Sequence, residues 1–184
     1  MHELQTEHTL YAFLCLALII AAWYDLKYQK IPNLINFTVA LVAIIFHTIF
    51  FGLEGFLFSG AGLLLGVAIF LPFYAFGGMG AGDAKLMGAV GAVVGAKGVF
   101  ISAVLTALYG GLYAVLLLLV YHRYAREMFA RAWAVLKTFV LTRQYVPVST
   151  PNPVQKRPRL CYGLAIALGT VTYLYWDFQG VVFF

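Results

Sequence analysis

The chain consists of long apolar runs that are separated by short stretches of turn-forming and charged residues. A membrane-spanning helix needs about 20 mainly apolar residues, because the hydrocarbon core of a bilayer is about 30 Å thick. Only 10% of the 184 residues are charged, whereas about 25% are charged in an average soluble domain. The pattern therefore predicts an integral membrane protein with little room for a separate soluble domain.

The apolar runs predict an all-α fold, a bundle of about six transmembrane helices in a single domain that covers residues 1–184. The fourth run is short and rich in Gly and Ala, which suits a helix that packs among other helices rather than against lipid. The predicted spans are 8–24, 34–51, 57–76, 84–98, 100–121 and 160–176.

Basic residues determine the expected orientation of these spans. With six crossings, all twelve Lys and Arg residues except Lys97 fall on one side. The positive-inside rule makes that side cytoplasmic and places both termini outside. The predicted cytoplasmic loop, 122–159, begins with an amphipathic segment that we expect to lie on the membrane surface. We therefore expect a multi-pass protein of the inner (cytoplasmic) membrane whose net charge of +5 meets anionic lipids, with no nucleic acid as partner.

Two of the seven acidic residues, Asp25 and Asp83, are expected at the cytoplasmic edge of the helix bundle. Asp25 ends the first predicted span and Asp83 begins the fourth, so two membrane crossings return the chain to the same depth. A charge beside lipid is costly unless it is paired, hydrated or used. Two neighbouring carboxylates share one proton, so the ionised one can activate water while the protonated one polarises a peptide carbonyl. This spacing points to aspartic-peptidase chemistry.

Simpler roles for the same residues remain open from the sequence. The aspartates could pair with Lys27 or Lys85, and Asp83 could cap the fourth helix. Gly80 and Gly82 would let a substrate backbone approach closely, so they are candidate loop residues for substrate binding. Lys85 joins them as a candidate, either as a structural residue or as a group that tunes the aspartate pair.

A second function class is a small proton-coupled transporter or channel that uses Asp25 and Asp83, because intramembrane carboxylates also mark ion pathways. Such proteins place acids near the bilayer midplane and often contain inverted repeats; no repeat is evident here. No cofactor or metal is expected, since the two cysteines form no C-x-x-C pair and no histidine cluster exists. The lone His47 is expected to be a hydrogen-bonded helix residue.

Several motifs resemble those of the type IV prepilin peptidases, which are GxGD membrane aspartyl proteases. "GAGD" at residues 80–83 matches the GxGD signature, and "DLKYQKIPN" at residues 25–33 looks like the first-aspartate motif of that family. "GDAKLMGAVGAVVG" and "YGLAIALG" resemble its other recurring stretches. The resemblance implies that Asp25 and Asp83 are the catalytic aspartates. It also implies a prepilin substrate whose leader peptide is removed at the cytoplasmic membrane face.

Two departures from the family pattern refine this expectation. Many bacterial members carry a cytoplasmic insert with two C-x-x-C pairs and also methylate the new N-terminus of the pilin. This chain lacks the insert, so it resembles the short, peptidase-only members that serve tight-adherence (Flp) pili. Cys161 also stands where the family usually has proline before "YG". The expected partner is therefore a type IV or Flp pilin precursor.

Overall fold

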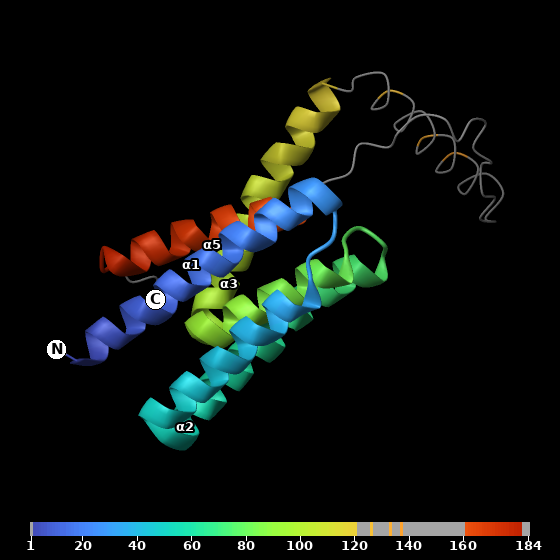
Figure 1. Ribbon diagram of the computed structural model, residues 1–184. Helices are drawn as coiled ribbons and strands as arrows, with labels where there is room; N and C mark the ends of the chain where they lie inside the picture. Colours follow the sequence, from blue (N-terminus) through green and yellow to red (C-terminus); the bar gives the residue numbers. More distant parts are fainter. Residues whose placement is uncertain (1, 121–125, 127–132, 134–136, 138–160, 182–184) are drawn as a thin grey trace. The chain divides into compact units, whose positions relative to one another are not determined.

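The computed structural model describes residues 2–120, 126, 133, 137 and 161–181. This part of the chain is all-α, as predicted, with α1 (His2–Tyr28), α2 (Asn33–Ala75), α3 (Ala81–Val120) and α5 (Tyr162–Phe178) (Figure 1). The chain divides into two compact units, Met1–Gly110 with Cys161–Phe184, and Gly111–Leu160. Most of the predicted cytoplasmic loop 122–159, with its amphipathic segment, lies outside the described residues. All functional residues discussed below belong to the first unit.

Helix α2 is a helical hairpin that reverses at Gly52. This residue has φ 60° and ψ −137°, a conformation that glycine adopts readily and other residues do not. Across the break, the ring of His47 lies 5.1 Å from the ring of Phe58, although residues eleven apart in a straight helix would be separated by about 16 Å. The reversal falls between the predicted spans 34–51 and 57–76.

Helix α3 reverses in the same way at Gly95, where φ is 72°. The ring of Phe58 occupies the space that a Cβ atom on Gly95 would need, so only glycine fits both the backbone and the packing. The predicted boundary, between 98 and 100, was placed a few residues too late. The segment contains several glycines, and the packing of Phe58, which is distant in sequence, determines that the helix reverses at Gly95.

Close contacts at glycine residues join the second half of α2 to the first half of α3. A Cβ atom on Gly62 would collide with the carbonyl group of Gly91, and one on Gly66 would collide with that of Met87. The hydroxyl of Ser59 donates a hydrogen bond to the Ala92 carbonyl oxygen at 2.8 Å. This part of α3 therefore runs antiparallel to the second half of α2, as expected for a short Gly- and Ala-rich helix inside a membrane bundle.

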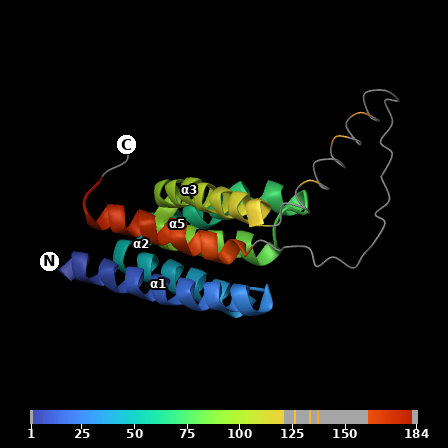
Figure 2. The same ribbon diagram turned by 90° about the horizontal axis from the view of Figure 1, so that it is seen from above.

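Helices α1 and α5 lie side by side and antiparallel (Figure 2). At one end, the Tyr11 hydroxyl donates to Asp177 Oδ2 at 3.0 Å. At the other, Asp25 contacts the first turn of α5. Their facing residues join both halves of α2 and both halves of α3 in one apolar core. Its most deeply buried large side chains are Leu14, Leu18, Leu86, Met87, Val90 and Ile166.

The first unit thus has two ends. The end that holds Asp25, Asp83 and Gly163 is called the aspartate end, and the end that holds Tyr11, Phe58 and Asp177 is called the far end. Because α2 and α3 each reverse, the described chain passes between these ends once in α1, twice in α2, once in the first half of α3 and once in α5. The second half of α3 returns as far as Gly110, which lies beside Tyr162 of α5. Among the described residues, three helices are long and apolar enough to cross a membrane: residues His8–Tyr28 of α1, all of α2 and all of α3. The arrangement fits a polytopic membrane protein, and six bilayer crossings remain a prediction.

Candidate active site

The Asp25 carboxylate is fixed by the N-terminus of a helix that is distant in sequence. Asp25 lies in the last turn of α1 and is only 7% exposed. Its Oδ2 atom accepts a 2.8 Å hydrogen bond from the backbone N–H of Gly163, the second residue of α5. The first N–H groups of a helix lack partners within the helix and carry partial positive charge. The carboxylate therefore satisfies the end of α5 and is held in place by it.

Asp83 is fixed by the start of its own helix. It is the third residue of α3 and 8% exposed, and its Oδ2 atom accepts a 3.0 Å hydrogen bond from the N–H of Gly80. The N–H of Asp83 in turn donates to the Gly80 carbonyl oxygen at 3.1 Å. The bond from Gly80 to the Asp83 side chain is one half of a capping box; the other half needs an N-cap side chain, which Gly80 lacks. The capping role considered from the sequence is present, and it engages only one oxygen of the carboxylate.

The two aspartates line the same cavity, at the aspartate end. The cavity has a volume of about 230 Å³, which is space for several water molecules at about 30 Å³ each. The lining residues are Asp25, Gln29, Lys30, Ile31, Asn33, Gly80, Ala81, Gly82 and Asp83. A reacting peptide and a water molecule could therefore meet both carboxyl groups.

Of the two candidate glycines, Gly80 precedes α3, whereas Gly82 lies in its first turn rather than in a loop. A Cβ atom on Gly82 would lie 3.3 Å from the Ile31 side chain and 3.5 Å from the Ile31 carbonyl oxygen. The missing side chain thus allows the segment after α1 to pack against the first turn of α3. In this position Gly82 supports Asp83, and its role in substrate approach remains a prediction.

Lys85 contacts Asn33 and Phe37. It is exposed, its Nζ atom donates to Asn33 Oδ1 at 3.1 Å, and it lies 5.8 Å from the centre of the Phe37 ring. Lys27 lies over the Tyr28 ring at 5.2 Å. Within the described ranges, no ion pair joins either aspartate to a lysine. These contacts favour the structural role for Lys85 over the tuning role.

Asn36 is a site residue that the sequence reasoning missed. It is buried in the first turn of α2, and its Nδ2 atom donates a 3.1 Å hydrogen bond to the Gly82 carbonyl oxygen. Its Oδ1 atom is buried and has no hydrogen-bond partner among the described residues. A signal was available, because an amide inside an apolar run is costly to bury unless it makes a specific contact. Asn36 ties α2 to the turn that carries Asp83.

The comparisons with known proteins agree with this geometry. A model of the Type IV leader peptidase family matches residues 12–115, which include Asp25 and Asp83 and make up more than half of the chain. Comparison with curated proteins and with solved structures gave no match. The family consists of aspartic peptidases, and membership implies leader-peptide cleavage in the membrane. The chain belongs to the Type IV leader peptidase family.

Proposed function

We propose that this protein is an intramembrane aspartyl endopeptidase that removes the leader peptide of type IV prepilin-like substrates, with Asp25 and Asp83 as its catalytic pair. The observation that carries the proposal is that two buried aspartates from separate helices line one cavity. Both lie within three residues of a helix end. A proton-coupled transporter would place such acids near the bilayer midplane, whereas Asp25 and Asp83 lie at one end of the first unit, so their position favours the peptidase.

The first chemical step divides two roles between the carboxyl groups. The ionised aspartate accepts a proton from a water molecule in the cavity as the water oxygen attacks the carbonyl carbon of the scissile peptide. The protonated aspartate donates its proton to the carbonyl oxygen, so that a neutral tetrahedral intermediate forms. Two carboxylates that interact closely do not both ionise easily, and sharing one proton supplies the acid and the base together.

In the second step the proton returns through the same pair. The aspartate that took the proton from water gives it to the amide nitrogen, and the C–N bond breaks. A hydroxyl proton of the intermediate passes to the other aspartate as the carbonyl re-forms. The products are a new amine, at the start of the mature pilin, and a new carboxyl group, at the end of the leader. The pair returns to its singly protonated state, ready for another cycle.

The hydrogen bonds at the site support this chemistry. Each carboxylate is anchored through Oδ2 by a backbone N–H. No hydrogen bond to Oδ1 of either aspartate is found among the described residues, which leaves one oxygen of each pair member for water or substrate. Backbone donors cannot change their protonation state, so they fix the orientation of the carboxylates without competing for the shared proton. Such preorganisation is a principal source of catalytic rate.

We further propose that the aspartate end faces the cytoplasm. Lys27, Lys30 and Lys85 lie at this end, and all the Lys and Arg residues of the segment 122–159 would join them. Phe76 and Leu53 are suitable labelling positions because they are 90% and 73% exposed and lie at opposite ends. With Cys15 and Cys161 replaced by Ala, an impermeant thiol reagent applied to intact cells should label Leu53→Cys and spare Phe76→Cys. Labelling of both from outside would contradict the orientation.

The substrate is expected to be a precursor of a type IV pilin, and a tight-adherence (Flp) pilin precursor is the narrower proposal. Its support is the sequence pattern, since the chain resembles the short members that lack a cysteine-containing insert. The substrate is itself membrane-inserted before cleavage, which gives a physical reason for a peptidase whose site lies at a membrane edge. The scissile segment must be extended when it enters the cavity, because a helix conceals its carbonyl carbons.

The direct test is co-expression of the protein with candidate prepilins, followed by mass determination of the pilin. Wild-type protein should remove the leader at a single bond, and Asp83→Asn should leave the precursor intact. Membrane extraction and thermal unfolding establish that the variant is inserted and folded. Leader removal at the normal rate by a folded Asp83→Asn protein would refute the catalytic assignment.

A further inference from the structure

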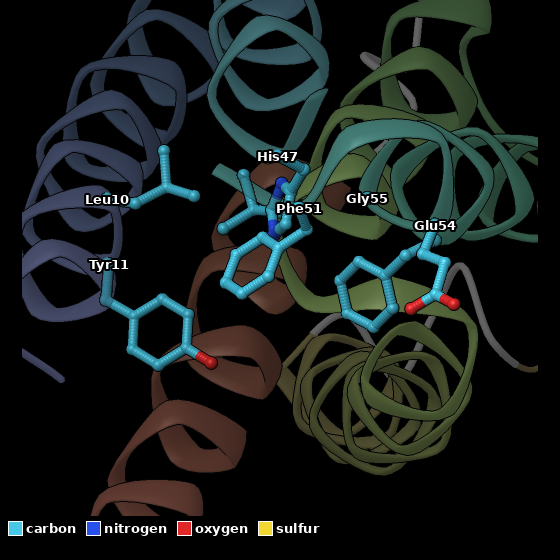
Figure 3. Close-up of a pocket in the computed structure, with 8 residues that line it drawn as sticks. Leu10, Tyr11, His47, Phe51, Glu54 and Gly55 are labelled. Carbon is cyan, nitrogen blue, oxygen red and sulfur yellow. The ribbon is translucent and has the colours of Figure 1, made fainter. Parts of the chain in front are cut away.

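A second cavity lies at the far end of the first unit, remote from the aspartate pair. Its volume is about 330 Å³, and α1, both halves of α2 and α3 contribute to it. Figure 3 shows Tyr11 and Glu54 on opposite sides, with His47 and Phe51 between them. The lining residues are Leu10, Tyr11, His47, Phe51, Glu54, Gly55, Phe58 and Val93. Tyr11 precedes Asp25 by fourteen residues of α1, or about 21 Å along a helix, so the peptidase chemistry does not use this space.

The polar side chains of this far-end cavity are hydrogen-bond acceptors. His47 is 8% exposed, and its Nδ1 atom lies 2.9 Å from the Ala43 carbonyl oxygen. A carbonyl oxygen can only accept, so Nδ1 carries the hydrogen, and in the tautomer with one ring hydrogen Nε2 is an acceptor. Glu54 contributes an ionisable carboxylate. Tyr11 gives its hydroxyl hydrogen to Asp177 and so offers the cavity no donor.

Aromatic rings form much of the remaining wall. The rings of Phe51 and Phe58 lie 6.2 Å and 5.1 Å from the His47 ring, and Tyr11 faces them from α1. The faces of such rings attract cations within about 6 Å. Lys97, the only basic residue expected at this end, is not among the lining residues. Acceptors, a carboxylate and aromatic faces together favour a cation that carries several N–H donors.

We propose that the far-end cavity is a binding site for a primary ammonium group, held by Glu54 and His47 and enclosed by Tyr11, Phe51 and Phe58. A primary ammonium has three N–H donors and one positive charge, which match the acceptors and the carboxylate. Phe51 and Phe58 are also partly exposed on the apolar surface of the helices, as are the neighbouring Leu53 and Leu57. A lipid with an ethanolamine head group could place its ammonium in the cavity and its acyl chains along that surface.

The test uses the purified full-length chain in dodecyl maltoside micelles and follows thermal unfolding by intrinsic fluorescence. Phosphatidylethanolamine, its mono- and dimethylated forms, phosphatidylcholine and phosphatidylglycerol are each titrated. The unfolding temperature should rise most with phosphatidylethanolamine and progressively less as methyl groups replace the N–H donors. Free ethanolamine forms a separate arm. A shift with the free amine assigns a soluble ligand, and a shift that requires the lipid assigns a head group.

Two variants of one residue provide the matched control. Glu54→Gln removes the charge from an exposed side chain, so it should fold and should need about tenfold more phosphatidylethanolamine for the same shift. Glu54→Asp keeps the charge and should stay closer to wild type. Equal shifts with phosphatidylethanolamine and phosphatidylglycerol would overturn the proposal. So would an ammonium-dependent shift that Glu54→Gln leaves unchanged, or no shift with either ethanolamine compound.

Discussion

The two ends of the first unit both combine acidic groups with a cavity, but they hold those groups in different ways. At the aspartate end, Asp25 and Asp83 are buried, and backbone N–H groups fix them at 2.8 Å and 3.0 Å. At the far end, Glu54 is exposed and stands beside aromatic side chains. Chemistry on a peptide bond requires carboxylates in fixed positions, whereas attraction of a cation tolerates a mobile one. The difference supports the proposal that Asp25 and Asp83, rather than Glu54, are the catalytic acids.

Both ends join residues that lie far apart in the sequence. The aspartate end joins Asp25, Asp83 and Gly163, which come from three helices. The far-end cavity takes most of its lining from the hairpin around Gly52, where His47 and Phe58 are close in sequence, and the Tyr11–Asp177 hydrogen bond at the same end joins residues 166 positions apart. The catalytic geometry therefore depends on the packing of the whole unit. Substitutions should affect cleavage strongly where they disturb the anchors at the aspartate end and weakly elsewhere.

The largest such effect is expected for Gly163→Ala. The added Cβ atom would lie 2.9 Å from Asp25 Oδ2 and 3.0 Å from Asp25 Cβ. Either the carboxylate or the start of α5 must shift, and a displacement of about 1 Å can reduce catalysis about 100-fold. Cleavage rates with a purified prepilin measure the effect. Gly60→Ala is the matched control, because nothing lies within 4 Å of its added Cβ atom; equal rates for the two variants would remove the anchoring role of α5.

A smaller effect is expected for Asn36→Ala. Loss of the hydrogen bond from Nδ2 to the Gly82 carbonyl oxygen loosens the turn before Asp83. A single hydrogen bond contributes about 1 kcal/mol, so kcat should fall roughly fivefold to tenfold while KM changes little. Thr48→Ala is the control, since it removes a side-chain bond to the Ile44 carbonyl in the same helix away from the site. A rise in KM at constant kcat would instead make Asn36 a substrate-binding residue.

Lys85→Gln should change cleavage by less than about threefold, because its ammonium contacts the exposed Asn33 side chain and such contacts contribute little. The dependence of cleavage on pH provides the sharper readout. If Lys85 is structural, the pH profile keeps its position. If the profile moves, Lys85 tunes the aspartate pair, and the structural role assigned to Lys85 is wrong.

The smallest effect on cleavage is expected for Asp177→Asn. Asp177 accepts a hydrogen bond from Tyr11 at the far end, so the substitution should lower the stability by about 1 kcal/mol or less. Leader cleavage should remain within twofold of wild type at a temperature where the protein is folded. Thermal unfolding and cleavage measured on the same preparation test both parts. A severe loss of cleavage without unfolding would show that the two ends are coupled.

Much of the helical arrangement could be predicted because apolar run length and glycine position are local signals. The reversal at Gly52 follows from a break between two runs that are each long enough for a helix. The position of the second reversal did not follow, because Gly91, Gly95 and Gly98 all stand in the same segment. Its position depends on the Phe58 ring, which lies 37 residues earlier and packs where a Gly95 side chain would stand. Tertiary packing decided between residues that are alike in sequence.

The position of Asp25 and Asp83 beside one cavity could be predicted from their expected depth, but the hydrogen bonds that hold them could not. The bond from Gly163 to Asp25 joins residues separated by 138 positions, and no local pattern in α5 marks its first turn as a donor to α1. From the sequence alone, capping of the fourth predicted helix is an alternative to a catalytic role for Asp83. The structure makes the cap and the cavity compatible, because only one carboxylate oxygen is engaged. The role of Asn36 could not be predicted either, because it depends on the Gly82 carbonyl oxygen, which lies 46 residues later in the sequence.

The most direct test of the central claim, that Asp25 and Asp83 act as one catalytic unit, is a double-mutant cycle. Prepilin cleavage is measured under single-turnover conditions for wild type, Asp25→Asn, Asp83→Asn and the double variant, with each protein shown to be folded. Each single substitution should abolish nearly all cleavage, because neither carboxyl group alone can accept one proton and donate the other. The double variant should then be scarcely slower than either single one. Independent, multiplicative losses, or substantial cleavage by either single variant, would contradict the account.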